Sequence, residues 1–135
     1  EAYRRAFQPS KSLREPRAMI AVAAVCAPTR EEAYRIAGTR SMWIHQALAR
    51  GRIIDLPSPD EVERLLSGMS AGERAQYQQV LEHSVIGTPD DCRQQIEAQA
   101  AEYGVDEVSI VTVTYHYADR ERSYRLLAEA FGLTA

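Results

Sequence analysis

Two apolar segments of this chain lack the alternation of polar and apolar residues that marks a strand with one face in water. Residues 19–25 read Met-Ile-Ala-Val-Ala-Ala-Val, and residues 108–114 read Val-Ser-Ile-Val-Thr-Val-Thr. A strand of this kind is covered on both faces, which is typical of parallel sheets flanked by helices. The two segments therefore predict buried parallel strands in an α/β domain.

Helix start signals separate these strands. A Ser or Thr stands three residues before a Glu at Thr29, Ser58 and Ser70, which is the capping-box pattern, and Thr88-Pro89 opens a further helix. With a short apolar run at residues 85–86, the expected order is strand, helix, two inserted helices, strand, helix, strand, helix. This order predicts one α/β unit over residues 1–135 that carries a helical insertion at residues 58–83. The insertion could cover a site or only extend a wall, and both possibilities stay open.

Composition excludes several classes of protein. The 135 residues carry 19 acidic against 16 basic side chains, a net charge of -3, which argues against nucleic acid as a ligand. The longest apolar run, residues 18–27, is half of the roughly 20 residues that a membrane-spanning helix needs. Cys26 and Cys92 have no metal-binding spacing, so we expect no metal and a reducing cytoplasm. Because residue 1 already lies in a helix-like segment without a Met, the chain is expected to be a piece of a longer protein.

The candidate site lies where the last strand ends, because ligands of α/β folds bind at the carboxyl ends of strands. Thr114 is followed there by Tyr115, His116 and Tyr117. One interpretation is an aromatic, polar wall in which His116 acts as hydrogen-bond donor or as acid and base. The alternative is that one Tyr enters the core and His116 is only solvated. At the earlier turn, Asp90 and Asp91 favour helix capping at Thr88 over the binding of an anion.

Several ordered stretches carry a family resemblance that runs through nearly the whole chain. They are Tyr3-Arg4-Arg5 with Phe7 and Pro9-Ser10; Val85-Ile86-Gly87-Thr88-Pro89; Gly104-Val105-Asp106-Glu107-Val108; and Tyr115-His116-Tyr117-Ala118 with Arg120, Arg122-Ser123-Tyr124 and Leu126-Leu127-Ala128. In order and spacing they resemble the later part of the luciferase-like flavin-dependent monooxygenases, the family of bacterial luciferase.

The resemblance implies a fold and a chemistry. It implies the C-terminal portion of a (β/α)8 TIM-type barrel, with about three βα units and a two-helix insertion. It implies a monooxygenase that uses reduced FMN, or the deazaflavin F420, together with O2 to oxidise a small organic substrate. Thr114, Tyr115 and His116 are then expected at the mouth of the substrate and flavin site, with His116 as the catalytic residue.

A second hypothesis needs no chemistry. Three parallel strands leave sheet edges open to pairing, so the chain could be a non-catalytic α/β module that completes its sheet with a second copy or with a partner chain. A homodimer is the form of association expected under either hypothesis.

Overall fold

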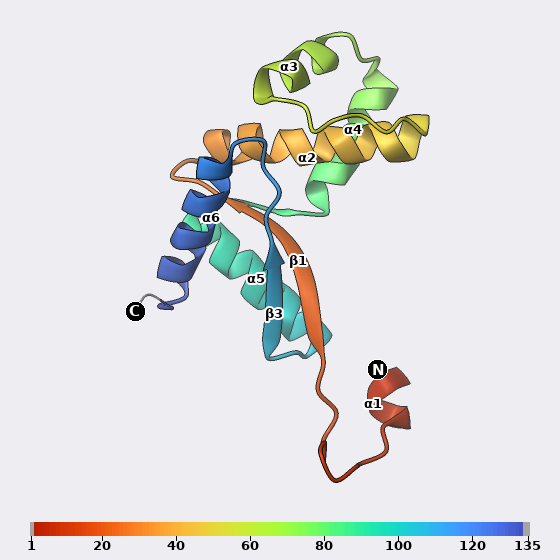
Figure 1. Cartoon of the computed structure of the whole chain (residues 1–135), viewed down its shortest axis with the longest axis vertical. Helices are drawn as coiled ribbons and strands as arrows, with labels where there is room; N and C mark the ends of the chain where they lie inside the picture. Colours follow the sequence, from red (N-terminus) through yellow and green to blue (C-terminus); the bar gives the residue numbers. More distant parts are fainter. Residues whose placement is uncertain (1, 134–135) are drawn as a thin grey trace.

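The structure is a computed structural model and describes residues 2–133. Its helices and strands follow one another along the chain as Figure 1 shows: α1 (Ala2–Ala6), β1 (Met19–Cys26), α2 (Arg30–Arg50), α3 (Pro59–Ser67), α4 (Ala71–Glu82), β2 (Val85–Gly87), α5 (Pro89–Tyr103), β3 (Glu107–Val111) and α6 (Tyr117–Ala130). The expected order of elements is therefore confirmed. Within the part of the chain that is described, no helix has the length and apolar character needed to cross a membrane.

The three strands form one open parallel sheet in the order β2-β1-β3. β1 pairs with β2 through Ala24 and Val85, and with β3 through Ala21 and Ser109. In a (β/α)8 barrel successive strands are neighbours and the sheet closes on itself. Here β3 pairs with β1 rather than with β2, and β2 and β3 are both edges of the sheet. The prediction that the chain is the C-terminal portion of a (β/α)8 barrel is therefore wrong. The described residues form a small α/β domain with one three-stranded sheet and six helices.

The helix ends follow the local signals. Complete capping boxes form at Ser58, Ser70 and Thr88, where each side chain accepts from the third helical N–H and the acidic residue there accepts from the cap. The box expected at Thr29 is only half formed, because Thr29 accepts from the Glu32 N–H while the Glu32 carboxylate pairs with Arg122. The helix therefore begins as predicted, and Glu32 is released for a tertiary contact.

Two apolar clusters lie on opposite faces of the sheet, since successive residues of a strand point to opposite sides. Val25, Ala27 and Ile86 pack with residues of α2, α3 and α4, including Ile36 and Tyr77. On the other face the alternate residues of β1 and β2 pack with α5 and α6: Val22, Ala24, Cys26 and Val85 against Cys92, Ile96 and Leu127. The helices following β1 thus cover one face, and the helices following β2 and β3 cover the other.

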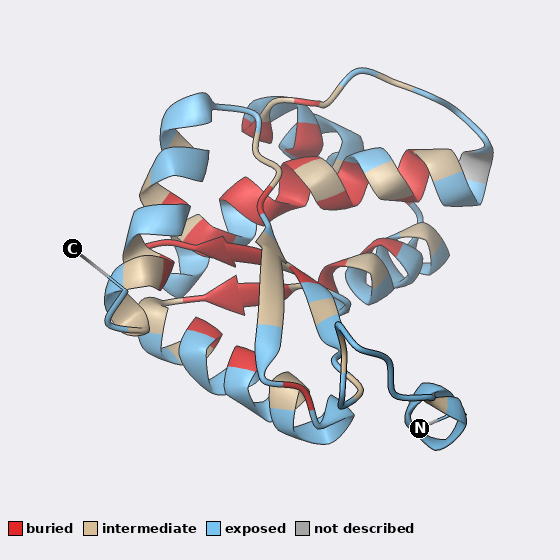
Figure 2. Ribbon diagram, turned by 60° about the horizontal axis from the view of Figure 1, so that its bottom comes forward, coloured by how far each residue is buried: buried red, intermediate tan, exposed pale blue. Residues whose placement is uncertain are grey.

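The cover of the α2 face is incomplete. α2 crosses only the carboxyl half of the sheet, so Met19 is 58% exposed, Val111 is 44% exposed, and Ala21 is exposed beside the half-buried Ser109. In Figure 2 β3 is accordingly tan and pale blue, whereas buried residues gather along α2 and the other two strands. The expectation that the strands at residues 19–25 and 108–114 are covered on both faces is wrong for this part. We call Met19, Ala21, Ser109 and Val111 the open sheet surface.

Gly87 permits the close approach of β2 to the first turn of α5. A Cβ atom placed on Gly87 would lie 2.6 Å from the Asp91 Cβ and 2.9 Å from its Oδ2. Real Cβ atoms do not approach other atoms this closely, so any larger residue displaces the capping carboxylate or the strand.

We expect Gly87→Ala to lower the free energy of unfolding by about 1–3 kcal/mol, the usual cost of overpacking. Urea denaturation followed by circular dichroism measures this change. Gly72→Ala is the matched control, because a Cβ at this helical position meets no atom within 4 Å, and alanine is the better helix former. Equal stability of the Gly87→Ala variant and the parent chain would contradict the packing argument.

Candidate functional site at the carboxyl end of the sheet

The carboxyl ends of the three strands meet at one end of the sheet, and the turns that follow differ in chemistry. Ala27 donates its N–H to the Gly87 carbonyl at 3.1 Å, which joins the first two turns. Both continue into helices through capping residues. Only the third turn, residues 112–116, ends in exposed aromatic and titratable side chains.

Thr114, Tyr115 and His116 are brought together in this turn. The Thr114 hydroxyl donates to the His116 carbonyl at 2.8 Å, which holds the turn. The rings of Tyr115 and His116 stand edge to face, with centroids 4.9 Å apart and planes at 87°. Tyr115 is 47% exposed and Tyr117 is 74% exposed, so neither phenol enters the core. The interpretation that one of these tyrosines is a core residue is therefore wrong.

His116 occupies the N-cap position of α6 without serving as a side-chain cap. Its backbone is extended, with φ -92° and ψ 132°, and its imidazole makes no capping hydrogen bond. An N-cap side chain usually accepts from the first helical turn. The imidazole is thus left for another contact, as a site residue requires, and its role in catalysis stays a prediction.

The base of this turn is fixed by hydrogen bonds that the sequence analysis did not identify. The Thr112 hydroxyl donates to the Ala24 carbonyl of β1 at 2.8 Å, and the Thr112 N–H donates to the Tyr124 hydroxyl at 3.1 Å. Tyr124 therefore lies over the edge of β3 at 37% exposure. Next to it the buried Ser123 hydroxyl accepts from the Cys26 N–H at 2.9 Å.

Two arginines tie the three turns to one another. Arg30 at the start of α2 donates to both carboxylate oxygens of Asp91 in α5, at 2.7 and 2.5 Å. Arg122 of α6 pairs with Glu32 of α2 at 2.5 Å and with Asp119 at 3.0 Å. The starts of α2, α5 and α6 are thereby cross-linked. No sequence pattern indicated the Arg30–Asp91 and Arg122–Glu32 pairs, because each links residues far apart in the chain.

Asp91 is committed to structure rather than to a ligand. The Arg30 guanidinium, and then the hydroxyl and N–H of Thr88, hold the pKa of this carboxyl well below its usual range. Cys92 beside it is fully buried, and its pKa is raised by the neighbouring Cys26 thiol and by burial. The prediction of helix capping at Thr88 is confirmed, and Cys92 is a core residue.

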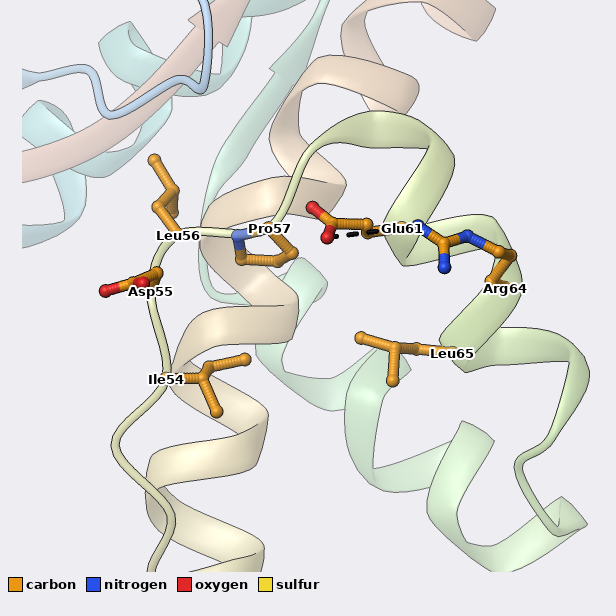
Figure 3. A pocket seen from close by; sticks show the side chains of 7 residues that line it. All are labelled: Ile54, Asp55, Leu56, Pro57, Glu61, Arg64 and Leu65. Atoms are coloured by element: carbon orange, nitrogen blue, oxygen red, sulfur yellow. Dashed lines mark ion pairs between the residues drawn. The ribbon is translucent and has the colours of Figure 1, made fainter.

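A hollow of about 360 Å³ lies away from the sheet, between the loop after α2 and helix α3 (Figure 3). Ile54, Leu56 and Leu65 line it together with Glu61 and Arg64. Trp43 of α2 donates its ring N–H to the Ile54 carbonyl at 2.9 Å and so anchors the loop. The Glu61 carboxylate already accepts from Ser58 and pairs with Arg64 at 3.8 Å. Two carboxylates, Asp55 and Glu61, line the hollow with Arg64, which pairs with Glu61, so we do not assign chemistry to it.

No group of three or more His, Cys, Asp or Glu side chains gathers in metal-binding geometry within residues 2–133.

Comparison with known proteins gives similar chains that are much longer. No protein-family model matches. The uncharacterized proteins YwcH and YvbT of Bacillus subtilis (strain 168) are 30% identical over 129 residues and 31% identical over 131 residues. These alignments cover 96% and 97% of this chain but 38% of each relative. A crystal structure of apo-MsnO8 superposes with a TM-score of 0.83 and 33% identity, over 98% of this chain and 40% of the other.

These findings correct the expected family. The prediction that the chain is the C-terminal part of a luciferase-like flavin-dependent monooxygenase is wrong, because the described residues form an open three-stranded sheet of a small α/β domain, the fold that superposes on MsnO8. The chain spans about two fifths of the length of the proteins that it resembles.

The hydrogen bond from the Thr112 N–H to Tyr124 predicts a local effect of Tyr124→Phe. Without the hydroxyl, this amide should exchange its hydrogen about fivefold faster, as expected for the loss of about 1 kcal/mol. Hydrogen exchange measured by NMR reads the amide directly. Tyr103→Phe serves as the control, since Tyr103 is 62% exposed on α5. Unchanged exchange at Thr112 would show that Tyr124 does not hold the end of β3.

The lowered pKa of Asp91 predicts a loss of stability in acid. The unfolded chain, with an Asp pKa of about 3.9, takes up this proton more readily than the folded chain does. The stabilising effect of Asp91 is therefore present above about pH 4 and lost as the pH falls. We expect Asp91→Asn to lower the Tm at neutral pH. We also expect the Tm of this variant to fall less than that of the parent chain as the pH drops below about 4.

Asp90→Asn is the control for this measurement, because Asp90 lies in the same helical turn and is exposed. Thermal melts from neutral to acidic pH give the Tm values of the three proteins. Parallel curves for the parent chain and Asp91→Asn would mean that the Arg30–Asp91 pair does not stabilise the fold.

Proposed function

We propose that this chain forms one wall of a small-molecule site in an oxidoreductase. The observation that carries the proposal is the Tyr115–His116 pair, edge to face at the carboxyl end of β3, with an imidazole that helix capping does not use. In open α/β sheets, ligands bind outside this end of the strands. The similar protein MsnO8 was crystallised in an apo form.

The residues of the turn suit a flat organic ligand. The Tyr115 ring presents an apolar surface on which a planar ring can stack, and the His116 imidazole can donate or accept a hydrogen bond. The Thr114 hydroxyl is engaged with the turn itself, so its role is to hold His116 in place. In this proposal the Tyr115 ring and the His116 imidazole contact the flat ring of the bound ligand, the flavin or the substrate beside it.

We propose reduced FMN as the cofactor, with F420 as the alternative and O2 as the co-substrate. A reduced flavin would supply the electrons with which O2 oxidises a small organic substrate. The described residues fit the flat ring of a flavin but not its phosphate, because the helix start at Thr88 carries Asp90 and Asp91. The phosphate partner would therefore come from outside these residues, and we derive no reaction step from the flavin.

A non-catalytic role is the second candidate, and the open sheet surface favours it. Met19 and Val111 are exposed there on strands whose other face is packed. β2 and β3 also present unpaired edges, which proteins normally cover. Under this proposal a second copy of the chain covers the surface and the chain is a homodimer. A cytoplasmic location is part of both proposals and agrees with two buried free cysteines.

The first proposal predicts that His116→Ala and Tyr115→Ala each weaken the binding of reduced FMN about tenfold, since one ring contact or charged hydrogen bond contributes about 1–2 kcal/mol. Anaerobic isothermal titration of the chain with reduced FMN measures the affinity. Tyr103→Ala is the control, because it removes an exposed phenol from a helix outside the site. The same series with reduced F420 distinguishes the two cofactors.

Absence of saturable binding of either flavin would overturn the cofactor proposal. Equal affinity of His116→Ala, Tyr115→Ala and the parent chain would remove this turn from the site. A dimer in sedimentation analysis that becomes monomeric on Val111→Asp, with no flavin bound, would support the non-catalytic proposal in its place.

A further inference from the structure

A groove of about 490 Å³ runs between α2 and α4, on the outer side of the α2 face. Arg40, Ile44 and Leu48 of α2 form one side of it, and Gln79, Val80 and His83 lie along the other. The residues of α2 recur every four positions, so they form a continuous stripe along the helix. No acidic side chain lines this groove among the described residues, although the chain as a whole has a net charge of -3.

The two ends of the groove differ in polarity. Arg40 lies at the end nearest the sheet, because it also borders Ala23 of β1 and Val111 of β3. Leu48 lies two turns further along α2, about 12 Å away for a rise of 1.5 Å per residue. It is 79% exposed. The groove therefore has a cation at one end and an uncovered apolar side chain at the other.

Arg40 differs from Arg30 and Arg35 of α2 in having no carboxylate partner among the described residues. Arg30 pairs with Asp91, and Arg35 pairs with Asp60 and Glu63. Within residues 2–133 the Arg40 guanidinium makes one side-chain hydrogen bond, to the Ser84 hydroxyl at 3.4 Å, and no ion pair. Burial lowers the pKa of Arg40 from its usual value. A guanidinium has five N–H donors, and leaving most of them without an acceptor in a half-buried place is costly.

The hollow of Figure 3 provides a contrast within the same molecule. There Arg64 faces Glu61, and the Glu61 carboxylate is also held by the helix cap. A second anion would have to displace an existing partner. In the groove between α2 and α4 the Arg40 guanidinium has no carboxylate partner among the described residues. An incoming carboxylate could therefore pair with Arg40 without displacing another one.

We infer that the groove between α2 and α4 binds a small organic acid with an apolar body. The carboxylate of the ligand accepts from the forked guanidinium of Arg40, a geometry in which two parallel hydrogen bonds can form. The apolar body lies along Ile44, Leu48 and Val80 and removes their surfaces from water. This site is separate from the turn at residues 112–116 and does not depend on the function proposed for it.

Sodium octanoate is the probe for this inference, and octylammonium is its matched counterpart with the same chain and the opposite charge. Isothermal titration of the parent chain should give saturable binding of one octanoate and no saturable binding of octylammonium. Arg40→Gln should weaken octanoate at least about tenfold, since a charge-assisted pair contributes about 1.4 kcal/mol or more. Arg35→Gln is the control, because it removes an equal charge from the same helix outside the groove.

Leu48→Ser is a second variant that tests the apolar end, and its exposed position makes misfolding a minor concern. We expect it to weaken octanoate about threefold or more, because part of the apolar contact is lost. NMR shifts on titration should concentrate at Ile44 and Val80. If circular dichroism shows that Arg40→Gln is unfolded, Leu48→Ser and the comparison with octylammonium decide the question.

Three results of the affinity measurements would overturn the inference. They are the absence of saturable octanoate binding, equal affinity for octylammonium, and unchanged affinity in a folded Arg40→Gln variant. Shifts confined to Met19 and Val111 would also overturn it, since they would place the ligand on the open sheet surface instead.

Discussion

The parallel pairing of β1 on both of its sides is the constraint on which the rest of the structure depends. A central parallel strand needs a crossover to each neighbour, and the two crossovers here leave their helices on opposite faces. β1 supplies residues to both apolar clusters. Its Ala24 carbonyl accepts a hydrogen bond from the Thr112 hydroxyl, and its Cys26 N–H donates one to the Ser123 hydroxyl. The carboxyl half of β1 is therefore the part of the molecule that positions both the turn after β3 and the start of α6.

Local signals in the sequence predict the elements well and their arrangement poorly. Ser58, Ser70 and Thr88 cap helices as expected, because a capping box involves only neighbours in the chain. Strand order is decided by contacts between distant segments, and the same alternation of strands and helices suits an open sheet as well as a barrel. The barrel was expected because the order of motifs resembles that of a barrel family. The order of motifs along the chain does not show that β3 pairs with β1.

The candidate site shows the same division. The position of Tyr115 and His116 at a strand end could be predicted, because it needs only the strand itself. The partner of Arg122 could not be predicted, because Glu32 lies 90 residues away in the chain. The capping-box pattern at Thr29 had moreover assigned the Glu32 carboxylate to the helix cap. The contact of Tyr124 with Thr112 could not be predicted either, because helical spacing identifies the side of a helix that faces the protein but not whether a strand edge or a core lies there.

The anchoring of the loop after α2 through Trp43 has a consequence for any spectroscopic study of this protein. Trp43 is the only tryptophan of the chain, and its indole N–H is bonded to the Ile54 carbonyl at 2.9 Å while its ring is 40% exposed. Intrinsic emission excited in the indole band thus senses the junction of α2 with this loop, where release of the hydrogen bond changes the polarity around the ring. It is insensitive to the aromatic turn after β3, whose chromophores are tyrosines. Fluorescence and far-ultraviolet signals that diverge would therefore report separate loosening of the helical layer and the sheet, two events that a single averaged melting curve conceals.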